Sequence, residues 1–170
     1  MKLPPYKTFP ILSGERILLR QIVPSEIMNI IEISFYDAKK ASSEAEALQM
    51  LEKINQDYLK GESIHWGVVD KLINTLVGTC GFYRGFKNGT GELGCVLLPQ
   101  YQGFGFMTKA MQLAMDFGKN NIGLKKIIAI TSHQNEKAIK LLDRLGFTAS
   151  QKEDQDEKYY EYKMEPILYK

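Results

Sequence analysis

The spacing of apolar and polar residues changes several times along the chain, and each change marks a new secondary-structure element. Short apolar runs bounded by turn residues predict strands at 16–21, 64–70, 75–83, 91–98 and 126–131, with a closing hairpin from 147–150 and 159–164. Apolar residues spaced three and four apart predict helices from 25 to about 35, 42–58, 106–118 and 135–145. This order of elements indicates an α+β domain with a mixed sheet and excludes a repeat protein or a helix bundle.

Composition narrows the class of protein without identifying its activity. The chain has 170 residues, 44% hydrophobic and 25% charged, so we expect one soluble globular domain over residues 1–170. Lysine and arginine total 22 against 20 acidic residues, and this small excess disfavours nucleic acid as a partner. We expect neither a signal peptide nor a membrane span, because prolines and charges interrupt the first residues and no stretch approaches roughly 18 apolar residues. Two cysteines and two histidines cannot form a zinc knuckle or a disulfide framework, so we expect no metal and a cytoplasmic location.

One segment has a pattern that suits a particular chemistry. From Gly94 to Thr108 a predicted strand leads through a glycine-containing turn directly into a helix. The first backbone N–H groups of a helix have no intrahelical acceptor and lie at the positive end of its dipole, where phosphate binds. Glycines at 103 and 105 would let a pyrophosphate approach the backbone, and the Thr108 hydroxyl would add a donor. The segment therefore predicts a phosphate-binding loop.

The spacing of the glycines distinguishes between kinds of phosphate loop. A Walker A loop needs GxxxxGK followed by Ser or Thr, which is absent, and the dinucleotide fingerprint GxGxxG would need a glycine where Thr108 stands. The sequence from Gln100 to Gly105 has instead a Gln, two residues, Gly, one residue and Gly. This spacing resembles the pyrophosphate loop of the GNAT acyltransferases.

Other parts of the chain share this resemblance. Residues 16–21 resemble the first strand of the family, and the Gly-Glu-Leu-Gly run at 91–94 resembles its fourth strand. Asn135-x-x-Ala138, followed by Gly-Phe at 146–147, resembles its last helix. The chain thus resembles a GNAT protein over nearly its whole length, and most resembles the branch that acetylates the N-termini of ribosomal proteins.

The resemblance implies a fold and a cosubstrate. The fold would be a mixed, mostly antiparallel sheet of about seven strands flanked by about four helices, with one strand pair splayed apart at the cofactor site. The cosubstrate would be acetyl-CoA, with Asn135 reaching its pantetheine from the last helix, although Asn135 also suits the N-cap of that helix. The pantetheine would run beside Val96, Leu97 and Leu98, and the pyrophosphate would bind the loop formed by Gln102, Gly103, Phe104, Gly105, Phe106, Met107 and Thr108.

Acetyl transfer needs a neutral amine and a polarised thioester carbonyl, and a backbone N–H of the splayed strand can polarise the carbonyl. Glu92 is the first candidate for the general base, because alternation places it on one face with Gly94 and Val96. An ammonium anchor and an ordinary strand glutamate are its alternatives. His133 is the second candidate. We expect His65, in a strand, to be a satisfied packing residue.

The sequence departs from the family where proton donors are expected. Many GNAT enzymes carry a tyrosine general acid at the position of Leu142, and the ribosomal branch often has serine at the position of Ala138. A thiol with a pKa of about 8.5 still leaves as thiolate, so activity is expected. The alternative is a catalytically silent acyl-CoA-binding domain that acts as a sensor or partner module.

The sequence does not specify a single acceptor or a single oligomeric state. The acceptor is expected to be a protein N-terminus or a small-molecule amine, attacked directly in a ternary complex. Asp37 and Glu62 are further possible ammonium anchors. The protein is expected to be a monomer or a homodimer.

Overall fold

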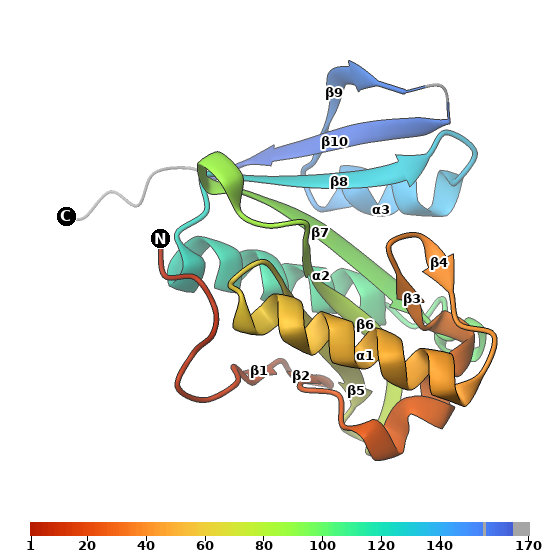
Figure 1. Cartoon of the computed structure of the whole chain (residues 1–170). Coiled ribbons are helices and arrows are strands. Elements are labelled where there is room, and N and C mark those ends of the chain that lie inside the picture. The colour runs from red at the N-terminus through yellow and green to blue at the C-terminus, as the bar shows by residue number, and fades with distance from the viewer. Residues whose placement is uncertain (155, 165–170) are drawn as a thin grey trace.

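The computed structural model describes residues 1–154 and 156–164, and its elements follow an α+β order (Figure 1). The strands are β1 (Leu12–Ser13), β2 (Ile17–Arg20), β3 (Phe35–Tyr36), β4 (Lys39–Lys40), β5 (Ile64–Asp70), β6 (Thr75–Tyr83), β7 (Thr90–Leu97), β8 (Lys126–Ser132), β9 (Thr148–Glu153) and β10 (Glu157–Lys163). The α-helices are α1 (Glu44–Leu59), α2 (Phe106–Phe117) and α3 (Glu136–Arg144). The other helical segments are η1 (Pro24–Ile33), η2 (Lys87–Gly89), η3 (Pro99–Tyr101) and η4 (Gly118–Ile122).

Eight strands form one mixed sheet at the centre of the molecule. Their order is β1-β2-β5-β6-β7-β8-β10-β9, and β3 and β4 form a separate two-stranded ribbon. Neighbouring strands of the sheet are antiparallel except β7 and β8, which are parallel. The closing hairpin forms as β9 and β10, with Gln155 of its turn outside the described residues. The predicted mixed, mostly antiparallel sheet is confirmed, with eight strands instead of about seven.

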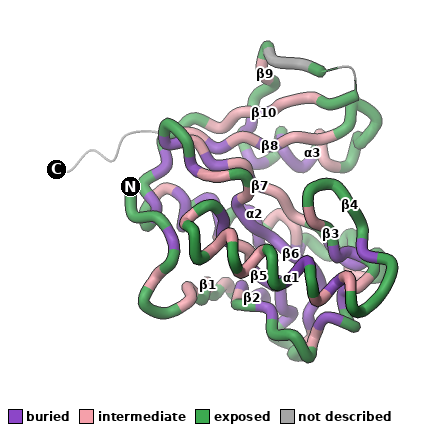
Figure 2. Tube along the Cα trace, in the orientation of Figure 1, coloured by how far each residue is buried: buried purple, intermediate pink, exposed green. Residues whose placement is uncertain are grey.

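Helices cover both faces of the sheet and bury two hydrophobic clusters (Figures 1 and 2). On one face, α2 contributes Phe106 to a cluster that includes Phe82 of β6. On the other face, η1 and α1 contribute Ile30 and Leu51 to a cluster that includes Leu76 of β6. Cover on both sides explains why β5 and β6 are buried along almost their whole length.

The element with the clearest end signals is α1. Ser43 is its N-cap, and the Ser43 hydroxyl accepts a hydrogen bond of 3.2 Å from the backbone N–H of Glu46. The helix ends at Leu59, and Gly61 follows with a left-handed φ of 80°. The helix predicted over 42–58 and the strands predicted over 64–70 and 75–83 are therefore confirmed.

The segment between β2 and α1 differs most from the prediction. The expected α-helix is the 3₁₀ helix η1, which is capped at Val23, with the Glu26 carboxylate accepting a 3.2 Å hydrogen bond from the Val23 N–H. The β3–β4 ribbon follows it and was not predicted. Asp37 and Ala38 form its turn with left-handed φ values of 48° and 61°, a conformation that normally favours Asn or Gly.

Arg16 connects the N-terminal strands to the start of α2. Its Nη2 lies 2.9 Å from Oδ2 of Asp70, and its guanidinium carbon lies 4.7 Å from the centre of the Phe106 ring. Asp70 is buried, and the backbone N–H of Leu72 donates to its Oδ1 at 3.0 Å. The hydrogen bond from Arg16 lowers the pKa of Asp70. Because Phe106 is the first residue of α2, Arg16 also supports the helix at the predicted phosphate loop.

We predict that Arg16→Met destabilises the protein, because it keeps the length of the side chain but leaves the buried Asp70 carboxylate unpaired. The expected result is a lower free energy of unfolding, measured by urea denaturation, with a loss larger than that of an exposed ion pair. The control is Lys140→Met, which breaks the exposed 3.6 Å pair with Glu136 and should cost less than about 0.5 kcal/mol. Equal losses in the two variants would show that the Asp70 pair contributes no more than a surface contact.

Candidate active site

β7 and β8 are paired over only three residues and then separate. The parallel register joins Thr90, Gly91 and Glu92 to Lys126, Ile127 and Ile128. β7 continues to Leu97 and β8 continues to Ser132, and each is held on its outer side by an antiparallel neighbour. Beyond the three pairs the inner edges of the two strands are not paired with each other. This is the splayed strand pair that the resemblance predicts.

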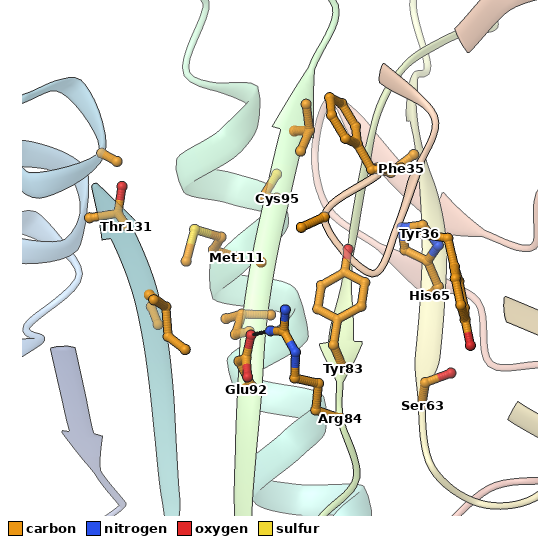
Figure 3. Close-up of a pocket in the computed structure, with 18 of the residues that line it drawn as sticks. Phe35, Tyr36, Ser63, His65, Tyr83, Arg84, Glu92, Cys95, Met111 and Thr131 are labelled. Atoms are coloured by element: carbon orange, nitrogen blue, oxygen red, sulfur yellow. Dashed lines mark hydrogen bonds and ion pairs between the residues drawn. The ribbon is translucent and has the colours of Figure 1, made fainter. Parts of the chain in front are cut away.

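A cavity of about 800 Å³ lies beside this split (Figure 3). Residues of the four strands β5–β8, of α2 and α3, and of the β3–β4 ribbon line it. All of residues 92–96 of β7 contribute to the lining, so it includes Glu92, Gly94 and Val96 without distinguishing their face of the strand, while Thr131 and Asn135 contribute from the β8 side. The volume is that of a small-molecule site.

The predicted phosphate loop leads into α2 through residues 102–105, which are exposed. Gly103 and Gly105 have left-handed φ values of 86° and 77°, and a Cβ at either position would meet no atom within 4 Å. Backbone conformation therefore requires these glycines, whereas packing does not. In the described part of the chain, the N–H groups of residues 103–108 donate to no backbone carbonyl. They are available to phosphate oxygens.

The side chains of this loop differ in their surroundings: some are exposed to solvent, one is buried in the core and one lines the cavity. Gln102 and Phe104 are exposed, and Thr108 is half-buried. Phe106 is buried under the loop, whereas Met107 lines the cavity. Backbone groups, more than side chains, therefore form the face that an anion would meet.

The end of β7 limits which residues can bind a pantetheine by strand-like hydrogen bonds. The Val96 side chain is exposed and lines the cavity, and Leu97 is buried in the cluster on the α2 face. The backbone N–H of Leu98 donates to the Val77 carbonyl at 2.9 Å, and its carbonyl accepts from Tyr101 at 2.9 Å. The backbone groups of Leu98 thus already have partners within the protein, and its contact with the cofactor stays a prediction.

Glu92 faces the cavity and is held by Arg84. The Arg84 guanidinium forms an ion pair with Oε1 of Glu92 (Figure 3). The Glu92 side chain is 14% exposed and that of Arg84 is 60% exposed. Burial raises the pKa of Glu92, and the neighbouring Arg84 opposes that rise. The sequence did not indicate this partner, because Arg84 follows β6 in a left-handed conformation, with φ of 56°, that turns the chain back toward β7.

His133 and Asn135 lie in the turn before α3 but face different surroundings. His133 is exposed, its Nε2 lies 3.4 Å from the Asp154 carbonyl oxygen, and it is absent from the described lining of the cavity. Its position gives no support to the second base candidate. Asn135 lines the cavity and is also the N-cap of α3, where its Oδ1 accepts a 3.1 Å hydrogen bond from the Ala138 N–H. The Asn135 amide nitrogen is not used by this cap.

His65 and Ser63 form a polar wall of the cavity that the sequence did not reveal. The expectation that His65 is a satisfied packing residue is wrong, because both its ring nitrogens are buried without a hydrogen-bond partner among the described residues. The Ser63 hydroxyl is in the same condition. Burial lowers the pKa of His65 to about 4, so its imidazole is neutral at pH 7.

Two glycines explain how the aromatic rings fit on this face of the sheet. His65 is in register with Gly81, and a Cβ on Gly81 would approach the His65 ring to 3.0 Å. A Cβ on Gly94 would approach the Tyr83 ring to 2.9 Å. The two rings meet edge to face with centroids 5.3 Å apart. Glycine at these positions lets the rings lie against the strands and leaves the cavity above them open.

The α3 side of the cavity supplies no proton donor at the positions where the family has one. Ala138 and Leu142 both line the cavity, and Leu142 is buried.

Within residues 1–154 and 156–164, no group of three or more His, Cys, Asp or Glu side chains could hold a metal ion. In the same residues, no helix is long and apolar enough to cross a membrane. Cys80 and Cys95 are free thiols that face each other across β6 and β7.

Comparison with known proteins identifies the family. Residues 16–148 match the family model described as an acetyltransferase (GNAT) domain. The chain therefore belongs to the GNAT family and is an acetyl-CoA-dependent acetyltransferase. The family resemblance of the loop, the fourth strand and the last helix is thus confirmed.

Individual relatives differ in the acceptors that their names print. An uncharacterized N-acetyltransferase, YoaA of Bacillus subtilis, is 28% identical over 147 residues, covering 82% of this chain and 83% of its own. The spermidine N(1)-acetyltransferase of Escherichia coli is 42% identical over 57 residues, covering 34% of this chain and 31% of its own. The structure of RimL, a ribosomal L7/L12 α-N-protein acetyltransferase in complex with coenzyme A, has a TM-score of 0.79 at 16% identity and covers 91% of this chain and 98% of its own. At that identity the likeness concerns the fold.

We predict that His65 makes the stability of the protein depend on pH. Between the unperturbed pKa of 6.5 and the folded value of about 4, the unfolded chain binds a proton that the folded protein does not. The free energy of unfolding should therefore fall as the pH falls through this range, by up to about 1.4 kcal/mol per pH unit. His65→Phe should remove this component, as measured by chemical denaturation at several pH values. His133→Phe, at an exposed position, is the control and should keep the wild-type slope; an unchanged slope in His65→Phe would contradict the prediction.

Proposed function

We propose that this protein transfers the acetyl group of acetyl-CoA to the primary amine of a protein N-terminus or a small molecule, by direct attack within a ternary complex. The observation that carries the proposal is the split between β7 and β8, which opens onto a cavity at the level of Glu92. The phosphate loop lies at the beginning of α2, the helix that follows β7 in the chain.

The residues along the split fit a CoA thioester, which supplies the activated acyl group when it is bound. The N–H groups of residues 103–108, which donate to no described backbone carbonyl, would hold the pyrophosphate, and the unpaired edge of β7 near Val96 would bond the amide groups of the pantetheine. A backbone N–H of the same edge would stabilise negative charge that develops on the carbonyl oxygen. The free amide nitrogen of Asn135 would donate from the opposite side.

Glu92 is proposed as the general base, acting directly or through a water molecule. Burial raises the pKa of Glu92, which makes it a stronger base than an ordinary glutamate, and the neighbouring Arg84 favours its ionised form. The proton of the amine would pass to Glu92. The CoA sulfur would leave as a thiolate, because Leu142 stands where a tyrosine would otherwise donate a proton. Relatives named for spermidine and for a ribosomal protein support keeping both kinds of acceptor in this proposal.

We predict that Gly105→Glu abolishes CoA binding, because a carboxylate in the loop repels the pyrophosphate. The matched control is Gly105→Gln, which introduces the same length and the same backbone strain at φ 77° without the charge. Binding is measured as the shift in melting temperature with CoA, which for the wild type at a hundredfold excess over Kd corresponds to about 2.7 kcal/mol. Equal CoA affinity in the wild type and Gly105→Glu would place the phosphates elsewhere.

We predict that Glu92→Gln lowers kcat/KM by roughly 10²- to 10⁴-fold, measured as thiol release, while the melting shift with CoA is retained. The wild-type profile should fall on the acid side as Glu92 takes up its proton, and the variant should lack this limb. Glu161→Gln, which affects another strand glutamate in an ion pair with a basic side chain, is the control and should keep wild-type kinetics. If Glu92→Gln raises mainly the KM for the amine, Glu92 is an ammonium anchor instead of a base.

A further inference from the structure

The end of the cavity beside α1 contains polar atoms that lack a partner. Ser63 is 6% exposed, and Figure 3 shows its side chain below that of His65 on the same stretch of chain. The Ser63 hydroxyl and both nitrogens of His65 are buried, and no other described residue bonds them. A buried polar atom left unpaired is costly, and native proteins keep few of them. Three such atoms on one wall of a cavity indicate a ligand with polar groups of its own.

The charge around the cavity shows what kind of polar group this ligand carries. Asp37, Asp57, Glu62 and Glu92 line the cavity, whereas Arg84 is the only lysine or arginine among its described lining residues. Arg84 is already paired with Glu92. The whole chain has a formal net charge of +2, so the negative charge of this lining is a local feature. It favours a cationic ligand over a neutral or acidic one.

Each of the three side chains considered at this end can accept a hydrogen bond. Asp57 offers a carboxylate, which takes one hydrogen bond of 2.9 Å from the Tyr36 hydroxyl. The Lys60 Nζ lies 3.9 Å from the other oxygen of Asp57, but the Lys60 side chain is 62% exposed and remains in solvent. Ser63 adds a hydroxyl oxygen, and neutral His65 adds a ring nitrogen. An ammonium group has three donors and no acceptor, so this set of groups matches it in both charge and hydrogen bonding.

We infer that Asp57, Ser63 and His65 form a distal ammonium site, which binds a second cationic amine of the acceptor, so that the acceptor is a small aliphatic diamine or polyamine. The inference rests on the proposed function, because the first amine must lie at the split between β7 and β8. His65, Gly81 and Gly94 are in register across β5, β6 and β7. Two strand spacings, about 10 Å, therefore separate the distal ammonium site from the strand where transfer takes place.

The experiment compares α,ω-diaminoalkanes of increasing chain length with n-alkylamines of the same lengths. Thiol release gives kcat and KM for each amine, and calorimetric titration of the diamines into the protein–CoA complex gives their affinity without turnover. We expect the diamine that matches the span to have a KM roughly tenfold to a hundredfold below that of the monoamine of the same length, as expected for hydrogen bonds to a charged group. Shorter diamines should lose this advantage.

Variants locate the effect. Asp57→Asn keeps the size of the side chain and an acceptor for Tyr36 but removes the charge, so the ratio of diamine to monoamine kcat/KM should fall roughly tenfold or more. His65→Phe should also lower this ratio while the free energy of unfolding at pH 5 rises, because a buried unpaired ring is removed. Glu52→Gln, on the exposed face of α1, is the matched control and should leave the ratio unchanged.

The results separate failure of this inference from failure of the proposed function. Diamines that bind no better than monoamines would overturn the inference, and so would a diamine preference that survives both Asp57→Asn and His65→Phe. A preference for peptides with a neutral N-terminal residue would also overturn it. If diamines bind the CoA complex and the variants lose that binding, but no amine releases thiol, the distal ammonium site stands and the proposed transfer reaction is wrong.

Discussion

Three residue pairs hold β7 and β8 together, and the open site exists because the pairing stops there. β7 is bonded to β6 from Glu92 to Leu97, and β8 is bonded to β10 from Lys126 to Ser132. Hydrogen bonds to the outer neighbour therefore keep each strand extended, while the inner edges of β7 and β8 separate. An unpaired strand edge inside a domain leaves N–H and C=O groups that need partners. The fold supplies no backbone partner across the split, so the edge is free for a ligand that itself carries amide groups.

The same split determines where an anion can bind. The chain leaves β7 through Pro99–Tyr101 and enters α2 at Phe106, so the start of α2 follows directly on the free edge. Gly103 and Gly105 have left-handed φ values, and the backbone N–H groups of this loop would bind the phosphates of a bound cosubstrate. The Arg16 guanidinium packs on the Phe106 ring and forms an ion pair with Asp70. The loop is thus supported from the core and exposed only on the side that would meet the cosubstrate.

The sequence predicted the elements that local patterns specify and missed those that depend on tertiary contacts. α1, β5 and β6 carry cap residues or apolar runs, and the phosphate loop carries its glycines, so their positions followed from short-range rules. The β3–β4 ribbon was missed because Asp37 and Ala38 adopt left-handed conformations with no glycine to signal them. The Arg84 partner of Glu92 and the unpaired nitrogens of His65 were missed because both depend on which residues of different strands the fold brings together. Whether the chain forms one domain over residues 1–170 is still a prediction.

The two partners of the Arg84–Glu92 ion pair differ in exposure, and this difference affects how an amine would bind in the cavity. The carboxylate is largely buried on β7, whereas the guanidinium is mostly in solvent and follows a strand end. An exposed guanidinium loses little when it leaves such a pair, since water replaces the carboxylate as its partner. The buried carboxylate keeps its need for a cation or a proton, which is why burial raises its pKa. A cationic amine that entered the cavity would take the place of Arg84, and in giving a proton to Glu92 it would become the neutral nucleophile that acetyl transfer requires.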